Sequence, residues 1–239
     1  NVINMGMYRL FDRLGVRYET GARDAAYPGR VVVYSGGGAL VEIYPGADAF
    51  FRANHAVCRN LILLPHTVRS YGELVAQMDS RCFLFAREQG SFDYLAAHAT
   101  GGAQVFLSHD LAFMLDDAVI RGLPWHPGYA RATSHAGPWL RMAVKFWLDA
   151  RRHRTLNCYR QDHEAPEGPV PETSRDLSKL FASADMSRLS CENTVKILRT
   201  VLRFYDRVES NRLHIAILAT LVGRQVTMHD NSYGKNRAI

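Results

Sequence analysis

The chain has 239 residues, an apolar fraction of 47% and a formal net charge of +6, which is typical of a globular protein with one large domain or two smaller ones. No apolar run reaches the roughly 18 residues that a membrane-spanning helix needs. The arginines are not interleaved with aromatic residues as in many nucleic-acid grooves, so we expect no nucleic-acid partner.

Cysteine usage indicates no metal centre and a reducing compartment. The four cysteines are widely spaced and form no metal-ligand pattern: Cys58, Cys82, Cys158 and Cys191. Cys82 and Cys158 fall in apolar, strand-like runs, where a free thiol behaves as a small hydrophobic group. We therefore expect a cytoplasmic protein.

The first half of the chain alternates strands with helices. After a helix over 4–14, buried strands are predicted at 30–34, 60–64, 81–86 and 104–107. This alternation predicts parallel βαβ units, whose ligands bind at the carboxyl ends of the strands. Those ends carry Gly36 to Gly38, Pro65 to Thr67, Arg87, and His109 with Asp110.

Two of these strand ends admit two interpretations each. The glycines at 36–38 either let the backbone approach a ligand closely or make a tight turn. Asp110 either caps a helix that begins at Leu111 or takes part in catalysis.

A proline- and glycine-bearing stretch over 115–138 is predicted to connect two domains. The helix predicted after it, Trp139 to Arg152, should turn Leu140, Val144, Trp147 and Leu148 inward. Its far face holds a basic cluster that could meet lipid phosphates or form a solvated face: Lys145, Arg151, Arg152 and Arg154.

The second half predicts a smaller α/β domain that ends in a strand-helix-strand unit over 206–228. Asn211 should cap the helix of this unit and place Arg212 and His214 in its first turn. That turn favours anions, an arginine fork binds phosphate or carboxylate, and a histidine moves protons near neutral pH. The alternative is that both side chains merely decorate a helix start.

Seven short motifs, in order along nearly the whole chain, resemble the polysaccharide pyruvyl transferase family. They are Gly36-Gly-Gly38, Leu63-Leu-Pro65, Phe85-Ala-Arg-Glu88, His109-Asp-Leu-Ala-Phe113, Arg160-x-Asp162-x-Glu164, Asn211-Arg-Leu-His214 and Asp230-Asn-Ser-Tyr-Gly-Lys235. Family members usually begin with Gly-Asn-x-Gly-Asp, of which Asn1 to Gly6 would be a remnant.

The resemblance implies an α/β fold with two Rossmann-like, parallel-sheet domains facing a cleft, as in GT-B glycosyltransferases. The domains would span 1–125 and 154–239, joined by a connection and linking helix over 126–153. It also implies transfer of pyruvate from phosphoenolpyruvate to sugar hydroxyls of an exopolysaccharide or cell-wall glycan precursor, without a metal or cofactor. The acceptor could be a saccharide or a lipid-linked oligosaccharide, which would bring the protein to the cytoplasmic face of the inner membrane.

The same resemblance assigns roles to individual residues. The implied donor-binding residues are Arg87, Arg212, Leu213, His214, Asn231 and Lys235, with Arg212 and His214 catalytic and His214 the general acid/base. The implied acceptor-binding residues are Gly36, Gly37, Arg160, Asp162 and Glu164, although the last three could instead form an internal ion-pair network. The helix dipole should keep His214 neutral until the donor's anion binds.

Two other functions are compatible with this architecture. A nucleotide-sugar glycosyltransferase would share the two-domain fold but bind a nucleotide in place of phosphoenolpyruvate. An inactive glycan- or anion-binding relative would bind the donor without forming a product.

Overall fold

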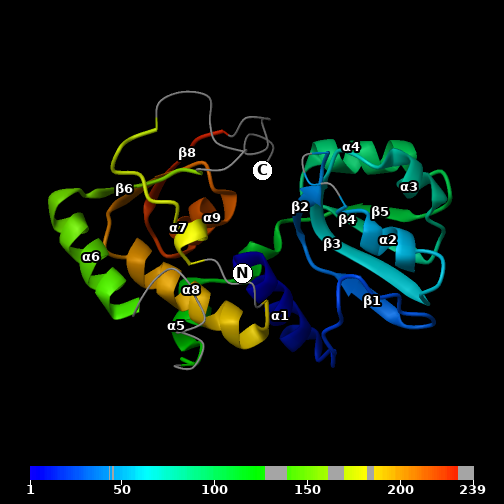
Figure 1. The fold of residues 1–239 in the computed structure, drawn as a ribbon, viewed down its shortest axis with the longest axis horizontal. Coiled ribbons are helices and arrows are strands. Elements are labelled where there is room, and N and C mark those ends of the chain that lie inside the picture. Colours follow the sequence, from blue (N-terminus) through cyan, green and yellow to red (C-terminus); the bar gives the residue numbers. More distant parts are fainter. Residues whose placement is uncertain (43, 45, 127–138, 161–169, 182–185, 231–239) are drawn as a thin grey trace. The chain divides into compact units, whose positions relative to one another are not determined.

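The computed structural model describes the chain except residues 43, 45, 127–138, 161–169, 182–185 and 231–239 (Figure 1). Two compact units are present, and each is built around its own sheet. The N-terminal unit is Phe11–Leu111, and the C-terminal unit joins Asn1–Leu10 to the described residues from Ala112 onward. The predicted functional domains over 1–125 and 154–239 stay a prediction.

The sheet of the N-terminal unit is parallel throughout. Its strands are β1 (Val31–Tyr34), β2 (Gly37–Leu40), β3 (Asn60–Val68), β4 (Cys82–Ala86) and β5 (Gln104–Leu107). Their order is β1-β3-β4-β5, and β2 pairs with β3 beyond the end of β1. The connecting helices are α2 (Ala49–Asn54), α3 (Gly72–Gln77) and α4 (Gln89–His98). The predicted alternation of strands and helices is confirmed from α2 onward, but β2 was not predicted: it begins within the glycines at 36–38, which we expected to form a turn or to approach a ligand.

Strand β3 is longer than the sequence predicts. We expected it to end near Leu64, but it continues to Val68. Its register with β4 is irregular between Leu63 and His66, where Pro65 supplies no N–H to the ladder. His66 and Thr67 therefore lie inside a buried strand, 2% and 0% exposed, rather than in a loop.

The C-terminal unit has a second parallel sheet, in the order β6-β7-β8. Its strands are β6 (Thr155–Cys158), β7 (Arg207–Ser210) and β8 (Gln225–Met228). Its helical elements are η1 (Leu111–Met114), α5 (Asp117–Gly122), α6 (Trp139–Arg152), α7 (Leu177–Leu180), α8 (Arg188–Leu202) and α9 (Leu213–Leu221). The predicted strand-helix-strand unit is β7-α9-β8.

Two further helices complete or correct the predicted arrangement. Helix α1 (Val2–Leu14) places Val2, Met5 and Tyr8 in the core of the C-terminal unit. Helix α5 lies within the stretch that we expected to be a plain connection, because six residues are too few to show a helical period. A bidentate ion pair from Arg199 to Asp117, with N–O distances of 2.7 and 3.0 Å, joins α5 to α8.

Helix α6 covers the predicted residues, but three of the four side chains predicted to face inward do not, and the fourth, Leu140, lies outside the described side chains. Val144, Trp147 and Leu148 are 48%, 40% and 50% exposed, whereas Ala143 and Phe146 are buried. Two neighbouring stripes of this helix are apolar, so periodicity alone could not choose between them. The choice is made by packing: the ring of Phe146 lies 6.3 Å from that of Phe181 in the core.

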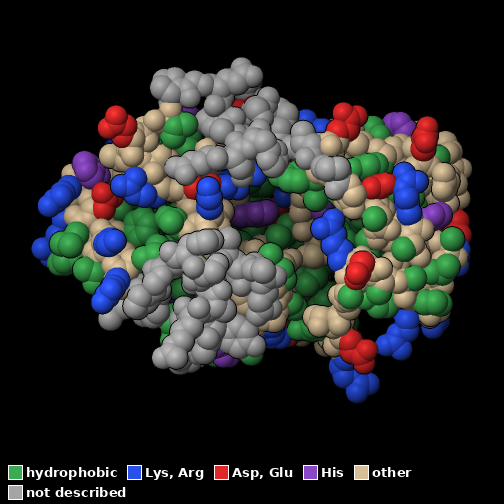
Figure 2. Space-filling model, in the orientation of Figure 1, with side chains coloured by type: hydrophobic (Ala, Val, Ile, Leu, Met, Phe, Trp, Pro, Cys, Tyr) green, Lys and Arg blue, Asp and Glu red, His purple; other side chains and the backbone are tan. Residues whose placement is uncertain are grey.

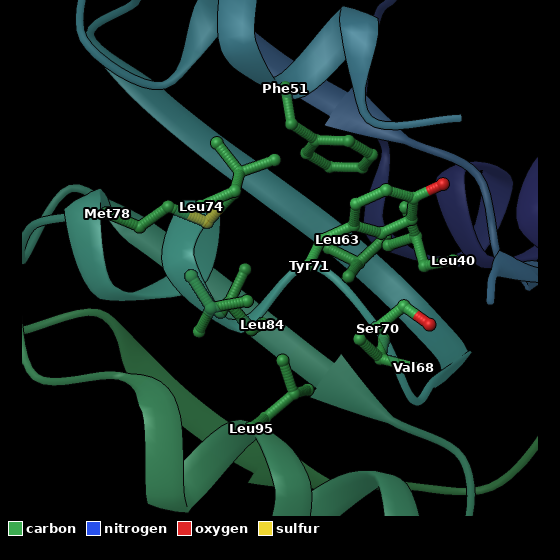
Figure 3. Close-up of a pocket in the computed structure, with 11 residues that line it drawn as sticks. Leu40, Phe51, Leu63, Val68, Ser70, Tyr71, Leu74, Met78, Leu84 and Leu95 are labelled. Atoms are coloured by element: carbon green, nitrogen blue, oxygen red, sulfur yellow. The ribbon is translucent and has the colours of Figure 1, made fainter. Parts of the chain in front are cut away.

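The core of the N-terminal unit leaves a small apolar pocket (Figure 3). Leu84 points into it from β4, and Phe51, Leu74 and Leu95 point into it from α2, α3 and α4. Its volume of about 10 Å³ is far below that of a small-molecule site, so it is packing space in the core.

No helix within the described part of the chain is long and apolar enough to cross a membrane.

Thiol chemistry tests the burial of the four cysteines. All four cysteines are buried and free, and burial raises the pKa of Cys82 to about 11 and that of Cys158 to about 12. We expect iodoacetamide at pH 8 to label no cysteine in the native protein and four in urea, measured by mass spectrometry.

The pH dependence of the free energy of unfolding follows from the direction of these two pKa shifts. Both folded pKa values lie above the ordinary value of 9.0, so the neutral thiols favour the folded state below about pH 9. That contribution is lost as the pH rises through 11 to 12. Native labelling of Cys82 or Cys158 at the rate of a free thiol would contradict the burial of these side chains.

Candidate functional site

Arg87 lies at the carboxyl end of the first sheet and is held from three strand ends. It follows β4 directly and is 4% exposed. Its Nε donates to Thr67 Oγ1 in β3 at 2.9 Å, and its Nη1 donates to Asp110 Oδ2, beyond β5, at 2.8 Å. The side chains of Arg87 and Asp110 are 1% and 0% exposed, so this is a buried ion pair.

The ion pair leaves part of the guanidinium unused. Its Nη2 makes no hydrogen bond to any other described residue. A buried guanidinium with one spare fork arm, already held rigid, can bind an anion with little further ordering. Asp110 was expected to cap a helix or to act in catalysis, and the ion pair with Arg87 is a contact that neither interpretation included.

Gly37, in β2, has a packing role. The backbone N–H of Ala39 donates to His66 Nε2 at 3.0 Å. A Cβ added to Gly37 would lie 3.0 Å from His66 Cε1, closer than ordinary contacts. Glycine at 37 therefore lets β2 pass close to the buried imidazole. Acceptor binding by Gly36 and Gly37 stays a prediction.

Glu88 fixes the turn that carries Arg87. It caps α4, and its carboxylate accepts the N–H of Ser91 at 3.0 Å and the Ser91 hydroxyl. Ser91 Oγ in turn accepts the N–H of Val68 at 2.8 Å. This buried network joins the end of β3 to the start of α4, on either side of Arg87.

Arg212 occupies the equivalent position in the second sheet, between β7 and α9. Its Nε donates to Asp176 Oδ1 at 3.0 Å and its Nη2 donates to Oδ2, so the pair is bidentate. The side chains of Arg212 and Asp176 are 15% and 2% exposed. Ser210 Oγ accepts the N–H of Arg212 at 2.9 Å and donates to the carbonyl of Cys158 at 2.8 Å, which fixes the backbone here.

The predicted cap of α9 is wrong. The helix begins at Leu213, and Arg212 takes the cap position without a side-chain capping bond. Asn211 is instead 2% exposed and accepts the N–H of Arg160 at 2.8 Å, which joins the ends of β6 and β7. His214 is the second helical residue and is partly buried, next to the buried Leu213.

Three residues at this edge escaped the sequence analysis. The hydroxyl of Tyr159 donates to Glu209 Oε2 at 3.3 Å, and His229 Nε2 lies 3.5 Å from the same oxygen. Burial, and then the charge of Glu209, raise the pKa of Tyr159 to about 12. Only their places at the strand ends could have indicated them.

The structure thus brings the predicted site residues together in two groups. Arg87, Gly36 and Gly37 belong to the N-terminal unit, and Arg160, Arg212, Leu213 and His214 belong to the C-terminal unit. Asp162, Glu164, Asn231 and Lys235 lie outside the described residues. Among the described residues no group of three or more metal-binding side chains forms a metal site.

Comparison with known proteins decides the family. The model of the polysaccharide pyruvyl transferase family matches residues 1–233. The chain belongs to this family.

A solved structure from Klebsiella pneumoniae subsp. pneumoniae NTUH-K2044, of a functionally uncharacterised protein, is similar to this polysaccharide pyruvyl transferase family member. It has a TM-score of 0.74 and 26% sequence identity, and the match covers 99% of this chain and 80% of that chain. The likeness supports the α/β fold with parallel sheets. Curated proteins gave no match.

The buried ion pair of the N-terminal unit makes a stability prediction. Asp110→Ala would leave the Arg87 charge buried without a partner, so we expect the free energy of unfolding of this unit to fall by about 3–5 kcal/mol. Replacing both partners, as in Arg87→Met with Asp110→Leu, should cost less because no charge stays buried. Hydrogen exchange of the β3 and β4 amides measures both. An Asp110→Ala protein as stable as the wild type would contradict the pairing.

Proposed function

We propose that this protein transfers pyruvate from phosphoenolpyruvate to sugar hydroxyls of an exopolysaccharide or cell-wall glycan precursor. Membership of the pyruvyl transferase family supports the reaction type. The observation that carries the choice of donor is that each unit presents one aspartate-held arginine at the carboxyl end of its sheet.

The donor's chemistry fits this pair of arginines. Phosphoenolpyruvate carries a phosphate and a carboxylate close together, so it needs more than one cation. Arg87 and Arg212 supply two, and the backbone N–H groups at the start of the nine-residue helix α9 add donors at Leu213 and His214. Asn231 and Lys235 would complete the donor site.

The two arginines belong to different units, so the proposal includes a domain arrangement. The two Rossmann-like domains would face across a GT-B-like cleft, with the donor held between them. Binding of one dianion by both domains would favour closure of the cleft and exclude water from the reaction.

His214 would act as the general acid/base. The reaction adds a proton to the methylene carbon of phosphoenolpyruvate, and two sugar hydroxyls form C–O bonds to the neighbouring carbon while its C–O bond to phosphate breaks. Of the two hydroxyl protons, one ends on the new methyl group and the other on inorganic phosphate. An imidazole beside the donor can accept one of these protons and return it.

Acceptor binding would fall to groups at the same strand ends. Arg160, Asp162 and Glu164 follow β6, and Gly36 and Gly37 belong to the N-terminal unit. The reaction requires no metal or cofactor in this scheme, and a cytoplasmic location would supply the donor.

Turnover tests the role of His214. We expect His214→Ala to lower phosphate release from phosphoenolpyruvate, with a glycan acceptor, by about 10²–10⁴-fold, because one positioned acid/base is lost. Phosphoenolpyruvate should still raise the melting temperature of the variant. His153→Ala, at an exposed site after α6, is the control and should retain full turnover.

The outcomes separate the competing functions. Turnover that survives His214→Ala would remove the acid/base assignment. A melting temperature raised by sugar nucleotides and not by phosphoenolpyruvate would indicate a glycosyltransferase. Donor binding without phosphate release, in the presence of every acceptor tried, would indicate a non-catalytic relative.

A further inference from the structure

Helix α6 exposes an apolar stripe to solvent. Val144, Trp147 and Leu148 lie on successive turns and are 48%, 40% and 50% exposed. The helix is anchored from its other side, where Ala143 and Phe146 are buried. The exposed stripe is therefore not needed for the core of the C-terminal unit, and three large apolar side chains on one helix face are more than a solvated helix needs.

Basic side chains flank this stripe. Arg141, Lys145, Arg151 and Arg152 are all exposed. Residues 141, 144, 145, 148 and 152 recur at spacings of three and four, so they share one face of the helix. The guanidinium carbon of Arg151 lies 3.9 Å from the centre of the Trp147 ring. Figure 2 shows basic and apolar side chains gathered over α6.

The face carries charge of one sign. The only acidic residue of α6, Asp149, is turned toward the core, where its carboxylate accepts the hydroxyl of Tyr205 at 2.7 Å. Arg154, just beyond the helix, is paired with Asp206, so we leave it out of the face. The partner that complements this surface is therefore anionic.

The apolar residues between the charges decide the class of partner. A nucleic-acid backbone offers phosphates but nothing to cover Val144 and Leu148, and α6 has no row of aromatic residues for bases to stack on. An anionic bilayer offers both, because headgroup phosphates meet the basic side chains and acyl chains receive the apolar ones. Tryptophan is also a preferred residue at membrane interfaces.

We propose that α6 docks this protein on an anionic lipid bilayer. The helix lies parallel to the membrane plane, with Val144, Trp147 and Leu148 entering the headgroup boundary and the basic residues contacting lipid phosphates. This is peripheral docking and stands independently of the proposed reaction. It is also compatible with an acceptor carried on a lipid.

Sedimentation with vesicles tests the proposal on the full chain. We expect binding to vesicles of phosphatidylglycerol with phosphatidylcholine, reduced by high salt, and little binding to phosphatidylcholine alone. Val144→Ser with Leu148→Ser removes the apolar part and keeps the charge. Arg141→Gln with Lys145→Gln removes charge and keeps the apolar part. Each pair should weaken binding at least about tenfold.

A matched control separates the face from net charge. Arg17→Gln with Arg23→Gln removes the same charge from exposed positions of the N-terminal unit and should leave binding within about twofold. Unchanged circular dichroism and an unchanged melting temperature show that the variants are folded. Wild-type binding by both α6 variants, or equal loss by the control, would overturn the proposal.

Two alternative partners give distinct results. If the face joins two copies of this chain, light scattering will show a dimer that Val144→Ser with Leu148→Ser converts to a monomer, with no vesicle binding by the wild type. If the face binds nucleic acid, the wild type will bind duplex DNA and will not bind vesicles. The apolar substitutions will then leave DNA binding unchanged. Either result overturns lipid docking.

Discussion

A buried guanidinium needs a counter-charge, and this requirement shapes the carboxyl end of both sheets. Removing an arginine from water is costly unless a carboxylate and hydrogen bonds compensate it. Asp110 and Thr67 do this for Arg87, and Asp176 does it for Arg212. The strand ends of each unit are arranged around one such pair, so the two arginines are rigid before any ligand arrives.

Rigid arginines are useful to an enzyme that binds a small dianion. Little side-chain entropy is lost when a pre-ordered fork meets a phosphate or carboxylate. Arg212 is the more open of the two, with 15% of its side chain exposed against 1% for Arg87. In the proposed mechanism Arg212 would therefore meet the donor first, beside His214, and Arg87 would complete its enclosure.

The sequence predicted every strand except β2 and placed Arg87 and Arg212 at strand ends, but it did not predict what holds the arginines. Short apolar runs with alternating helices sufficed for the parallel sheets, and the donor-binding role that the motifs imply for Arg87 and Arg212 stays a prediction. Their aspartates lie 23 and 36 positions away and carry no local signal, because ion pairs between distant segments depend on the completed fold. The predicted inward face of α6 was wrong for a related reason. Two stripes of the helix are apolar, and only the packing of Phe146 in the core determines which one is buried.

The exposed face of α6 and the arginine sites describe two separate properties of one chain. In our proposals, the first concerns where the protein works and the second concerns which donor it binds. Exposed apolar residues beside arginines do not fit a helix that packs in a core. They are the expected composition of a helix at a lipid interface. The residues wrongly predicted to face inward thus form the surface that we propose to dock on lipid.

The central claim is that Arg87 and Arg212 bind the same donor molecule, and a double-mutant cycle tests it most directly. Each arginine is replaced together with its aspartate, as Arg87→Met with Asp110→Leu and Arg212→Met with Asp176→Asn, so that no carboxylate stays buried and unpaired. The measured quantity is the Kd for phosphoenolpyruvate of the wild type, each paired variant and the combination. The account predicts that each paired variant loses most of the affinity and that the combined loss in free energy is smaller than the sum, because one site is shared. Wild-type affinity in either paired variant would contradict it.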